Sequence, residues 1–238
     1  MTTQIVTDEQ LGRLSKRMHD LFERVRTGGV DFQQTLDGLQ LLAEKKSETI
    51  NLDNPNSRDI ATWQKFYKKV FEGVVVDFSN IHIPERPGKD WWLIIVAKGM
   101  TPERLFQKCR EKFGAWKWTD DGLDKIVISD RTAKSWHYAI WVKANVEADE
   151  EFRNMSANQL KEQGHNGITL EERLVLELFY FWKTKKHLDI QNWTLCTGSR
   201  CSDGRVPGVG WRDDGKLDVS GCNSGNAHDR LRSRQVVS

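Results

Sequence analysis

The sequence has little that would indicate an export signal, a membrane span or a strongly charged partner. Its first ten residues, MTTQIVTDEQ, contain no apolar core of the kind that secretory signals carry. The longest apolar run, at 174–182, is interrupted by Glu177 and falls short of the roughly 18 residues that cross a bilayer. A net charge of +2 gives no electrostatic reason to expect nucleic acid or an anionic membrane as a partner. We therefore expect a protein that is cytoplasmic or virion-associated, without membrane insertion.

The residues needed for metal binding or catalysis are also scarce. The four cysteines form no CxxC pair, and no two of the six histidines have metal-ligand spacing. The stretches 120–124 and 213–215 are typical of turns rather than calcium loops. Since no nucleophile triad, P-loop or GxGxxG motif occurs, we expect no metal, no cofactor and no catalytic residue. A disulfide between Cys201 and Cys222 stays an open alternative to two free thiols.

The composition changes near residue 196. After Thr197 the chain has no Glu, Phe, Tyr, Ile or Met, and Lys216 is its only lysine. Small polar residues dominate, and a sparse apolar framework interrupts them. We expect this framework to be buried and to determine the local fold; its main members are Val206, Val209, Trp211, Leu217, Val219 and Leu231. Arg230, Arg232 and Arg234 alternate, which predicts contacts with carboxylates from one face of a strand.

Several motifs in residues 91–238 resemble the variable proteins of diversity-generating retroelements. In the tail these are GSR (198–200), SDG (202–204), VP (206–207), Trp211, LRSR (231–234) and VVS (236–238). Upstream they are YAIWV (138–142), EADEE (147–151), SANQLKEQ (156–163), GITLEERL (167–174) and KHLDI (186–190). The resemblance implies a C-type lectin fold whose C-terminal variable region is rewritten at adenines. It also implies a protein that binds a protein or cell-surface ligand and is not an enzyme.

The residue types in the tail fit this mechanism. Mutation of an adenine-starting codon with a pyrimidine third base cannot produce Lys, Glu, Gln, Met or Trp, and none of these occurs from Asp218 to Arg230. Ordinary preferences for Gly, Asn and Ser in loops explain the same absence, so both interpretations stand. The predicted ligand-binding variable residues are Cys201, Arg205, Gly208, Gly210, Arg212, Asp213, Gly221, Cys222, Asn223, Ser224, Asn226, Ala227 and His228. Trp211 is a candidate for a fixed aromatic floor beneath them.

The N-terminal region shows helical patterns. Thr7 and Gln10 form a capping box, and Leu11, Leu14, Met18, Leu21 and Val25 recur every three or four residues, which predicts a helix over 7–26. A second stripe from Phe32 to Ala43 predicts an αα-hairpin over 8–45, and a third helix follows around 60–71. Such stripes pack either against the rest of the protein or against another copy. We consider a homo-oligomer that joins through Leu14, Met18 and Leu21.

Between these helices and the tail, strands and helices alternate. Residues 74–78, 91–97, 115–118, 125–128 and 137–142 have strand-like patterns, and helices are predicted to begin at Pro102, near 157 and near 170. The fold class is therefore α+β: N-terminal helices, then a C-type lectin-like domain with short strands, two helices and long loops. The expected divisions are a helical region at 1–72, an α/β segment packing on the lectin-like domain at 73–135, and that domain at 136–238 with its variable region at about 196–238.

Two other functions fit the same sequence. The chain could be a helical interaction or regulatory protein whose loop-rich C-terminal part is only a module. It could also be a formylglycine-generating-type oxidase, an activity found on the C-type lectin fold. That oxidase needs a reactive cysteine pair, and Cys201 and Cys222 do not match its motif.

Overall fold

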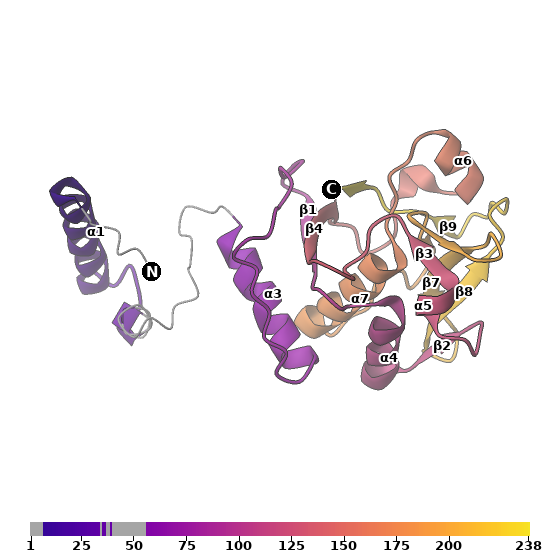
Figure 1. The fold of residues 1–238 in the computed structure, drawn as a ribbon, viewed down its shortest axis with the longest axis horizontal. Helices are drawn as coiled ribbons and strands as arrows, with labels where there is room; N and C mark the ends of the chain where they lie inside the picture. The colour runs from indigo at the N-terminus through magenta and orange to yellow at the C-terminus, as the bar shows by residue number, and fades with distance from the viewer. Residues whose placement is uncertain (1–6, 34, 37–38, 40–55) are drawn as a thin grey trace. The chain divides into compact units, whose positions relative to one another are not determined.

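In the computed structural model the described residues are 7–33, 35–36, 39 and 56–238 (Figure 1). The chain divides into two compact units, Met1–Asn51 and Leu52–Ser238. The architecture is mixed α+β, as predicted. Among the described residues, no helix combines the length and apolarity that crossing a bilayer requires.

The first unit contains one well-defined amphipathic helix, α1 (Asp8–Arg26). The predicted capping box is confirmed, since the Thr7 hydroxyl accepts from the backbone N–H of Gln10 and the Gln10 side chain accepts from that of Thr7. The helix ends before Gly28, which has a positive φ of 75°. No side chain of α1 is buried. The second helix of the expected hairpin lies partly outside the described residues.

The second unit contains the remaining elements. Its helices are α3 (Ser57–Val70), α4 (Pro102–Phe113), α5 (Leu123–Ile126), the 3₁₀ turn η1 (Glu150–Phe152), α6 (Ala157–Glu162) and α7 (Leu170–Thr184). Its strands are β1 (Trp91–Val96), β2 (Ala115–Lys117), β3 (Val127–Ser129), β4 (Tyr138–Lys143), β5 (Trp193–Leu195), β6 (Ser199–Cys201), β7 (Val206–Trp211), β8 (Leu217–Cys222), β9 (Leu231–Arg232) and β10 (Val236–Val237).

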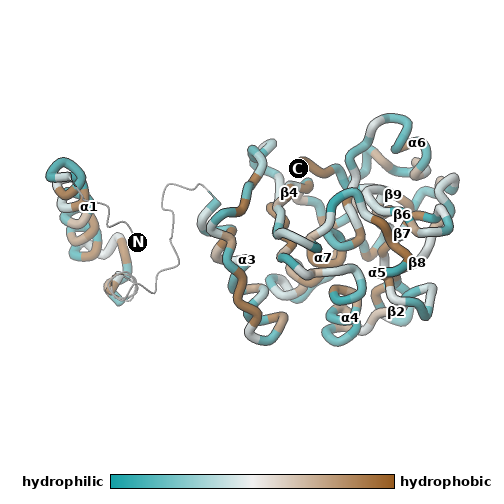
Figure 2. Tube along the Cα trace, viewed as in Figure 1, coloured by the Kyte–Doolittle hydropathy of each residue, from teal (hydrophilic) through white to brown (hydrophobic). Residues whose placement is uncertain are grey.

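Helix α7 lies at the centre of this unit and packs against α3, α4 and β1 (Figure 1). It begins with a capping box of Thr169 and Glu172, and every side chain from Leu170 to Leu178 is buried. The start near residue 170 is confirmed, and the first half of the helix is buried on all sides. Helix α3 packs against both β1 and α7: Trp63 and Tyr67 donate to the carbonyls of Leu93 and Ile95 in β1, and the apolar segments of α3 are visible in Figure 2.

Three sheets organise the strands. β4 lies between β1 and β10 in an antiparallel sheet, and β3 pairs with β6. The largest sheet has the order β2-β8-β7-β5-β9 and is built around the β7–β8 hairpin. Residues 73–135 supply one strand to each sheet, while residues 136–238 supply the partners. The chain shows one division into compact units, after Asn51.

Two predicted strands differ from the structure. Residues 74–78 pair with no strand among the described residues, although Val74, Val76 and Phe78 pack against the core. Their alternation therefore reflects burial of every second side chain and not a hydrogen-bonded ladder. Residues 125–128, predicted as a strand, are split: α5 ends at Ile126, and β3 begins at Val127.

A buried network of charged residues joins α7 to the C-terminal segment. Asp189 accepts hydrogen bonds from Arg173 at 2.9 Å, from Arg234 at 2.7 Å and from the Thr194 hydroxyl at 2.5 Å. Arg173 also donates to Glu177 at 2.8 Å. All five side chains are fully buried, so each charge depends on its partners instead of water.

The three tail arginines make different contacts. Arg232 pairs with Glu150 and Arg234 with Asp189, so the expected carboxylate contacts are confirmed for these two residues. Arg230 instead donates to the backbone carbonyl of Gln191.

Candidate functional site: the glycine face

One side of the five-stranded sheet gathers several of the predicted variable residues. Gly208 pairs with Ser220 and Gly210 with Asp218, so these four residues share one side of the sheet. We call this side the glycine face; its residues are Trp116, Trp193, Leu195, Val206, Gly208, Gly210, Asp218, Ser220 and Cys222, of which Leu195 and Val206 are buried. The opposite side carries Val209, Trp211, Leu217 and Val219, which pack into or against the core.

Trp193 lies directly over the two glycines. A Cβ atom added at Gly210 would lie 2.5–2.7 Å from three indole atoms of Trp193, closer than real contacts allow. One added at Gly208 would lie 2.6 Å from the Cys222 sulfur and 3.6 Å from Trp193. The absence of side chains at positions 208 and 210 therefore gives the indole its place on the sheet. Trp193 is half-buried there and presents a fixed aromatic surface.

We expect Gly210→Ser to displace the Trp193 ring and to cost about 1–3 kcal/mol of stability, as overpacking usually does. Acrylamide quenching of tryptophan fluorescence should increase, and this increase should disappear in a Trp193→Phe background. The matched control is Gly122→Ser, because a Cβ there meets nothing within 4 Å. Unchanged quenching together with unchanged stability for Gly210→Ser would contradict this packing.

Arg212 completes one end of the glycine face. Its guanidinium lies 5.1 Å from the centre of the Trp116 ring and 3.8 Å from the Asp218 carboxylate. Ser220 donates to Asp218 at 2.7 Å. Burial raises the pKa of the Asp218 carboxyl, while the Ser220 hydrogen bond and the charge of Arg212 oppose that rise. The exposed indole of Trp116, the guanidinium and the carboxylate thus form a compact group of donors, acceptors and aromatic surface.

The segment after β8 supplies polar side chains beside this face. Asn223, Asn226, Ala227 and His228 are exposed, and Ser224 is half-buried. Local hydrogen bonds fix the loop: Asn223 Oδ1 accepts from the N–H of Gly225, and His228 Nδ1 accepts from that of Arg230. The carbonyl of Ser224 accepts from the N–H of Asn158, which ties the loop to α6. The loop thus displays side chains from an ordered backbone.

The two tail cysteines are free thiols. Cys201 is buried and Cys222 is half-buried. Burial raises the pKa of each thiol to about 11, so almost no thiolate forms near neutral pH.

Not all predicted variable residues lie together. A Cβ added at Gly221 would approach the Arg205 guanidinium at 3.0–3.2 Å, so Arg205 lies on the side opposite Cys222. Arg205 pairs there with Asp203 and lies 5.8 Å from the centre of the Trp118 ring. Arg205 therefore does not share a face with Cys222. Asp213 lies in the β7–β8 turn, as predicted, and is exposed.

The aromatic residue over the glycines of this face is Trp193, and not Trp211 as the sequence suggested. Trp211 points to the core side, where it is half-buried and donates from its indole N–H to the carbonyl of Leu188 at 2.9 Å. Leu231 is also half-buried instead of buried, whereas Val206, Val209, Leu217 and Val219 are fully buried. The alternating Gly208 and Gly210 were a usable signal, since glycines on one side of a strand often mark the close approach of a large group.

Comparison with known protein families, with curated proteins and with solved structures finds no match for this chain.

Proposed function

We propose that this chain is the variable protein of a diversity-generating retroelement. Its second unit would be a C-type lectin-like domain that displays diversified residues on the glycine face and the loop at 223–228. The ligand would be a protein or another molecule on a cell surface. The chain itself would be cytoplasmic or virion-associated.

The observation that carries the proposal is the separation of two residue sets within one hairpin. Along β7 and β8, Val209, Leu217 and Val219 face the core, while Gly208, Gly210, Asp218 and Ser220 face the other way. Sequence changes at Arg212 and in the exposed loop after β8 would leave the apolar packing of the first set intact, whereas changes at Gly208 and Gly210 would disturb Trp193.

The chemistry of the site fits recognition better than catalysis. Tryptophan and arginine are enriched where proteins bind other proteins, and asparagine, serine and glycine supply adaptable hydrogen bonding. The glycine face presents Trp116 and Trp193, with Arg212 at one end and the amides of Asn223 and Asn226 in the loop after β8. Cys201 and Cys222 do not match the reactive cysteine pair that the alternative oxidase function needs.

Sequencing of the genome around the coding region tests the proposal. We expect a reverse transcriptase gene nearby and a near-identical copy of the segment that encodes residues 196–238. Sister genomes should differ mainly at exposed tail positions whose template codons contain adenine. The proposal fails if both features are missing, or if substitutions fall on Val209, Leu217 and Val219 as often as on the loop.

A tail library should separate exposed from buried variable positions. At Arg212, Asp213, Asn223, Asn226, Ala227 and His228, replacement by residue types from pyrimidine-ending codons should change stability by about ±0.5 kcal/mol per site or less. A matched library at Cys201, Gly208 and Gly210 should be less stable, because these positions are buried. Thermal melts of both libraries provide the measurement. If most members of the exposed library unfold, those positions are structural and the display proposal is wrong.

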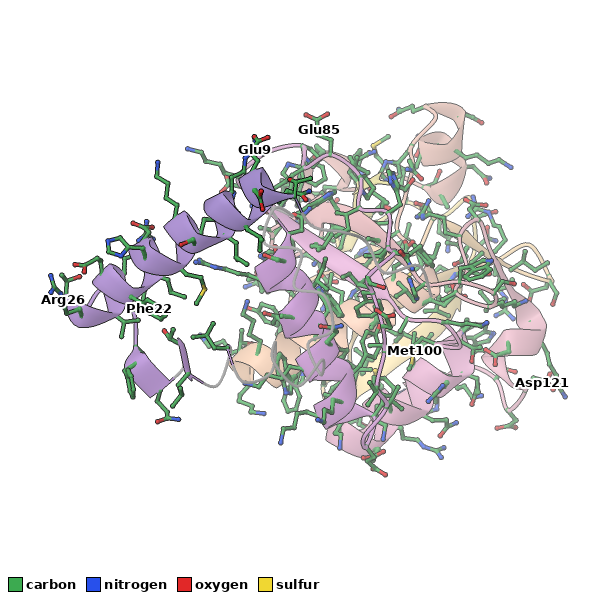
Figure 3. The ribbon with its side chains drawn as sticks, turned by 60° about the vertical axis from the view of Figure 1, so that its left-hand side comes forward. Glu9, Phe22, Arg26, Glu85, Met100 and Asp121 are labelled. Carbon is green, nitrogen blue, oxygen red and sulfur yellow. The ribbon has the colours of Figure 1, made fainter. Side chains whose placement is uncertain are left out.

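Helix α1 leaves part of its apolar side exposed. Leu11, Leu14 and Phe22 are 51%, 57% and 54% exposed, while Met18, Leu21 and Val25 are half-buried; Phe22 is labelled in Figure 3. Leu11, Leu14, Met18, Leu21 and Val25 follow the alternating three- and four-residue spacing of a helix-pairing seam. We therefore propose that α1 joins copies of this chain, which would present several glycine faces at once and raise avidity.

This self-association predicts a change in mass on point mutation. The full chain should be an oligomer by light scattering, and Leu14→Glu combined with Met18→Glu should yield a monomer with unchanged melting of the second unit. Lys16→Glu combined with Arg17→Glu, two polar positions of the same helix, is the control and should leave the oligomer intact. A monomeric full-length protein at micromolar concentration would exclude this arrangement.

A further inference from the structure

The second unit contains an aromatic cavity that is separate from the glycine face. The cavity has a volume of about 310 Å³ and lies between α3, β1 and the second half of α7. Trp63, Leu93 and Leu176 form its buried part. The half-buried aromatic residues Trp91, Trp92, Phe179 and Tyr180 line the rest of its wall. Volumes of roughly 300–1,000 Å³ with mainly aromatic linings are typical of small-molecule sites.

The aromatic walls are held in place by packing. The Trp63 and Phe179 rings are stacked, with centroids 3.9 Å apart and an interplanar angle of 14°. The indole N–H of Trp63 donates to the carbonyl of Leu93 at 3.1 Å. Trp92 contacts Tyr180, with ring centroids 5.6 Å apart. A cavity with such fixed walls loses little conformational entropy when a flat ligand enters it.

The exposed lining residues carry an excess of positive charge. Arg86, Lys183 and Asp59 are exposed, and so is Thr184. Within the described part of the chain, neither Arg86 nor Lys183 pairs with a carboxylate: Arg86 donates to the carbonyls of Lys89 and Trp91, and the Lys183 ammonium lies 5.8 Å from the centre of the Phe179 ring. Asp59 lies in the first turn of α3, where its charge is partly balanced by the helix dipole.

We propose that this cavity binds a small aromatic molecule bearing one negatively charged group. The flat apolar part would contact the Trp63, Trp92 and Phe179 rings, and the anionic group would remain near Lys183 and Arg86. Aromatic-lined sites also accept organic cations, but those sites lack two unpaired cations at the entrance. This ligand class does not depend on the function proposed for the glycine face.

Calorimetric titration of the full chain with three naphthalene probes tests the ligand class. We expect 2-naphthoate to bind with one-to-one stoichiometry and a Kd between about 10 µM and 1 mM, a range consistent with the efficiency of small ligands. Neutral 2-naphthalenemethanol should bind more weakly, and 2-naphthylmethylammonium at least tenfold more weakly. Absence of saturable 2-naphthoate binding up to several millimolar would overturn the proposal, and so would equal or tighter binding of the cation.

Point variants test whether 2-naphthoate binds in this cavity. Lys183→Glu should weaken 2-naphthoate binding at least fivefold, whereas Lys186→Glu, the same charge change at an exposed residue outside the lining, should not. Leu176→Phe should reduce binding by filling the cavity; if it does not fold, Thr184→Trp at the exposed entrance serves instead. Trp193→Phe on the glycine face should leave binding unchanged. Retained affinity in the filled or blocked variant, or loss in Trp193→Phe, would refute the assignment to this cavity.

Discussion

Replacement of Asp189 by asparagine should lower the free energy of unfolding by about 3–5 kcal/mol, because it leaves the buried Arg234 without a counter-ion and Arg173 with Glu177 alone. Asp189 accepts from Arg173 and Arg234, and all three side chains are fully buried. Burial raises the pKa of its carboxyl, but the charges of Arg234 and Arg173 outweigh this and hold that pKa below its usual value. The φ of Asp189 is 53°, a conformation that asparagine tolerates well, so the substitution removes charge without adding backbone strain.

Denaturant melts of the two proteins would measure this loss. Asp229→Asn is the matched control, because Asp229 makes only an exposed pair with Arg153 at 3.7 Å and should cost less than about 1 kcal/mol. Similar small losses for both variants would show that water reaches the buried network and shares its charges.

The helices were predictable because their signals are local. Capping boxes at Thr7, Ser156 and Thr169 each lie within four residues of chain, and all three open helices in the structure. The pairing of strands depends on distant residues and was less accessible. Every second residue of 74–78 packs against the core, as in a strand, yet no strand among the described residues pairs with this segment.

The buried charged network around Asp189 also depends on contacts between distant parts of the chain. Arg173 and Glu177 are four residues apart on one helix, so their pairing follows from helical geometry. Their link to Asp189 and Arg234 depends on how the C-terminal segment returns to α7, which no local pattern encodes. The alternation of the tail arginines predicted carboxylate partners for Arg232 and Arg234 without identifying them.

For the candidate site, alternation along one strand placed Gly208, Gly210 and Arg212 together, and the structure agrees. It could not show that Trp193, from a neighbouring strand, covers the glycines, because that contact depends on the β5–β7 register. Alternation along β7 also could not predict the position of Arg205, because this residue precedes β7 and turns toward Gly221 on the opposite side of the sheet.

Glu171 should make the protein less stable as pH rises. Its side chain is 2% exposed, and its Oε2 atom has no hydrogen-bond partner among the described residues. Burial raises the pKa of this carboxyl to about 7 from an ordinary value of 4.5; a hydrogen bond from Ser129 opposes the rise, and the Glu172 carboxylate adds to it. The folded protein therefore binds more protons than the unfolded chain between these two pKa values. Stability from this group is complete below about pH 4.5 and is lost as pH rises through 7.

Glu171→Gln removes this titration. The difference in unfolding free energy between the variant and the original protein should shift by about 3 kcal/mol in favour of the variant from pH 4 to pH 8, since each unit of pKa shift corresponds to about 1.4 kcal/mol. Denaturant melts at several pH values provide the curve. Glu162→Gln, at an exposed position of α6, is the control and should leave the pH dependence of stability unchanged. Parallel curves for Glu171→Gln and the original protein would mean that Glu171 is hydrated in the folded state, and that the contact between the start of α7 and β3 is more open than its burial indicates.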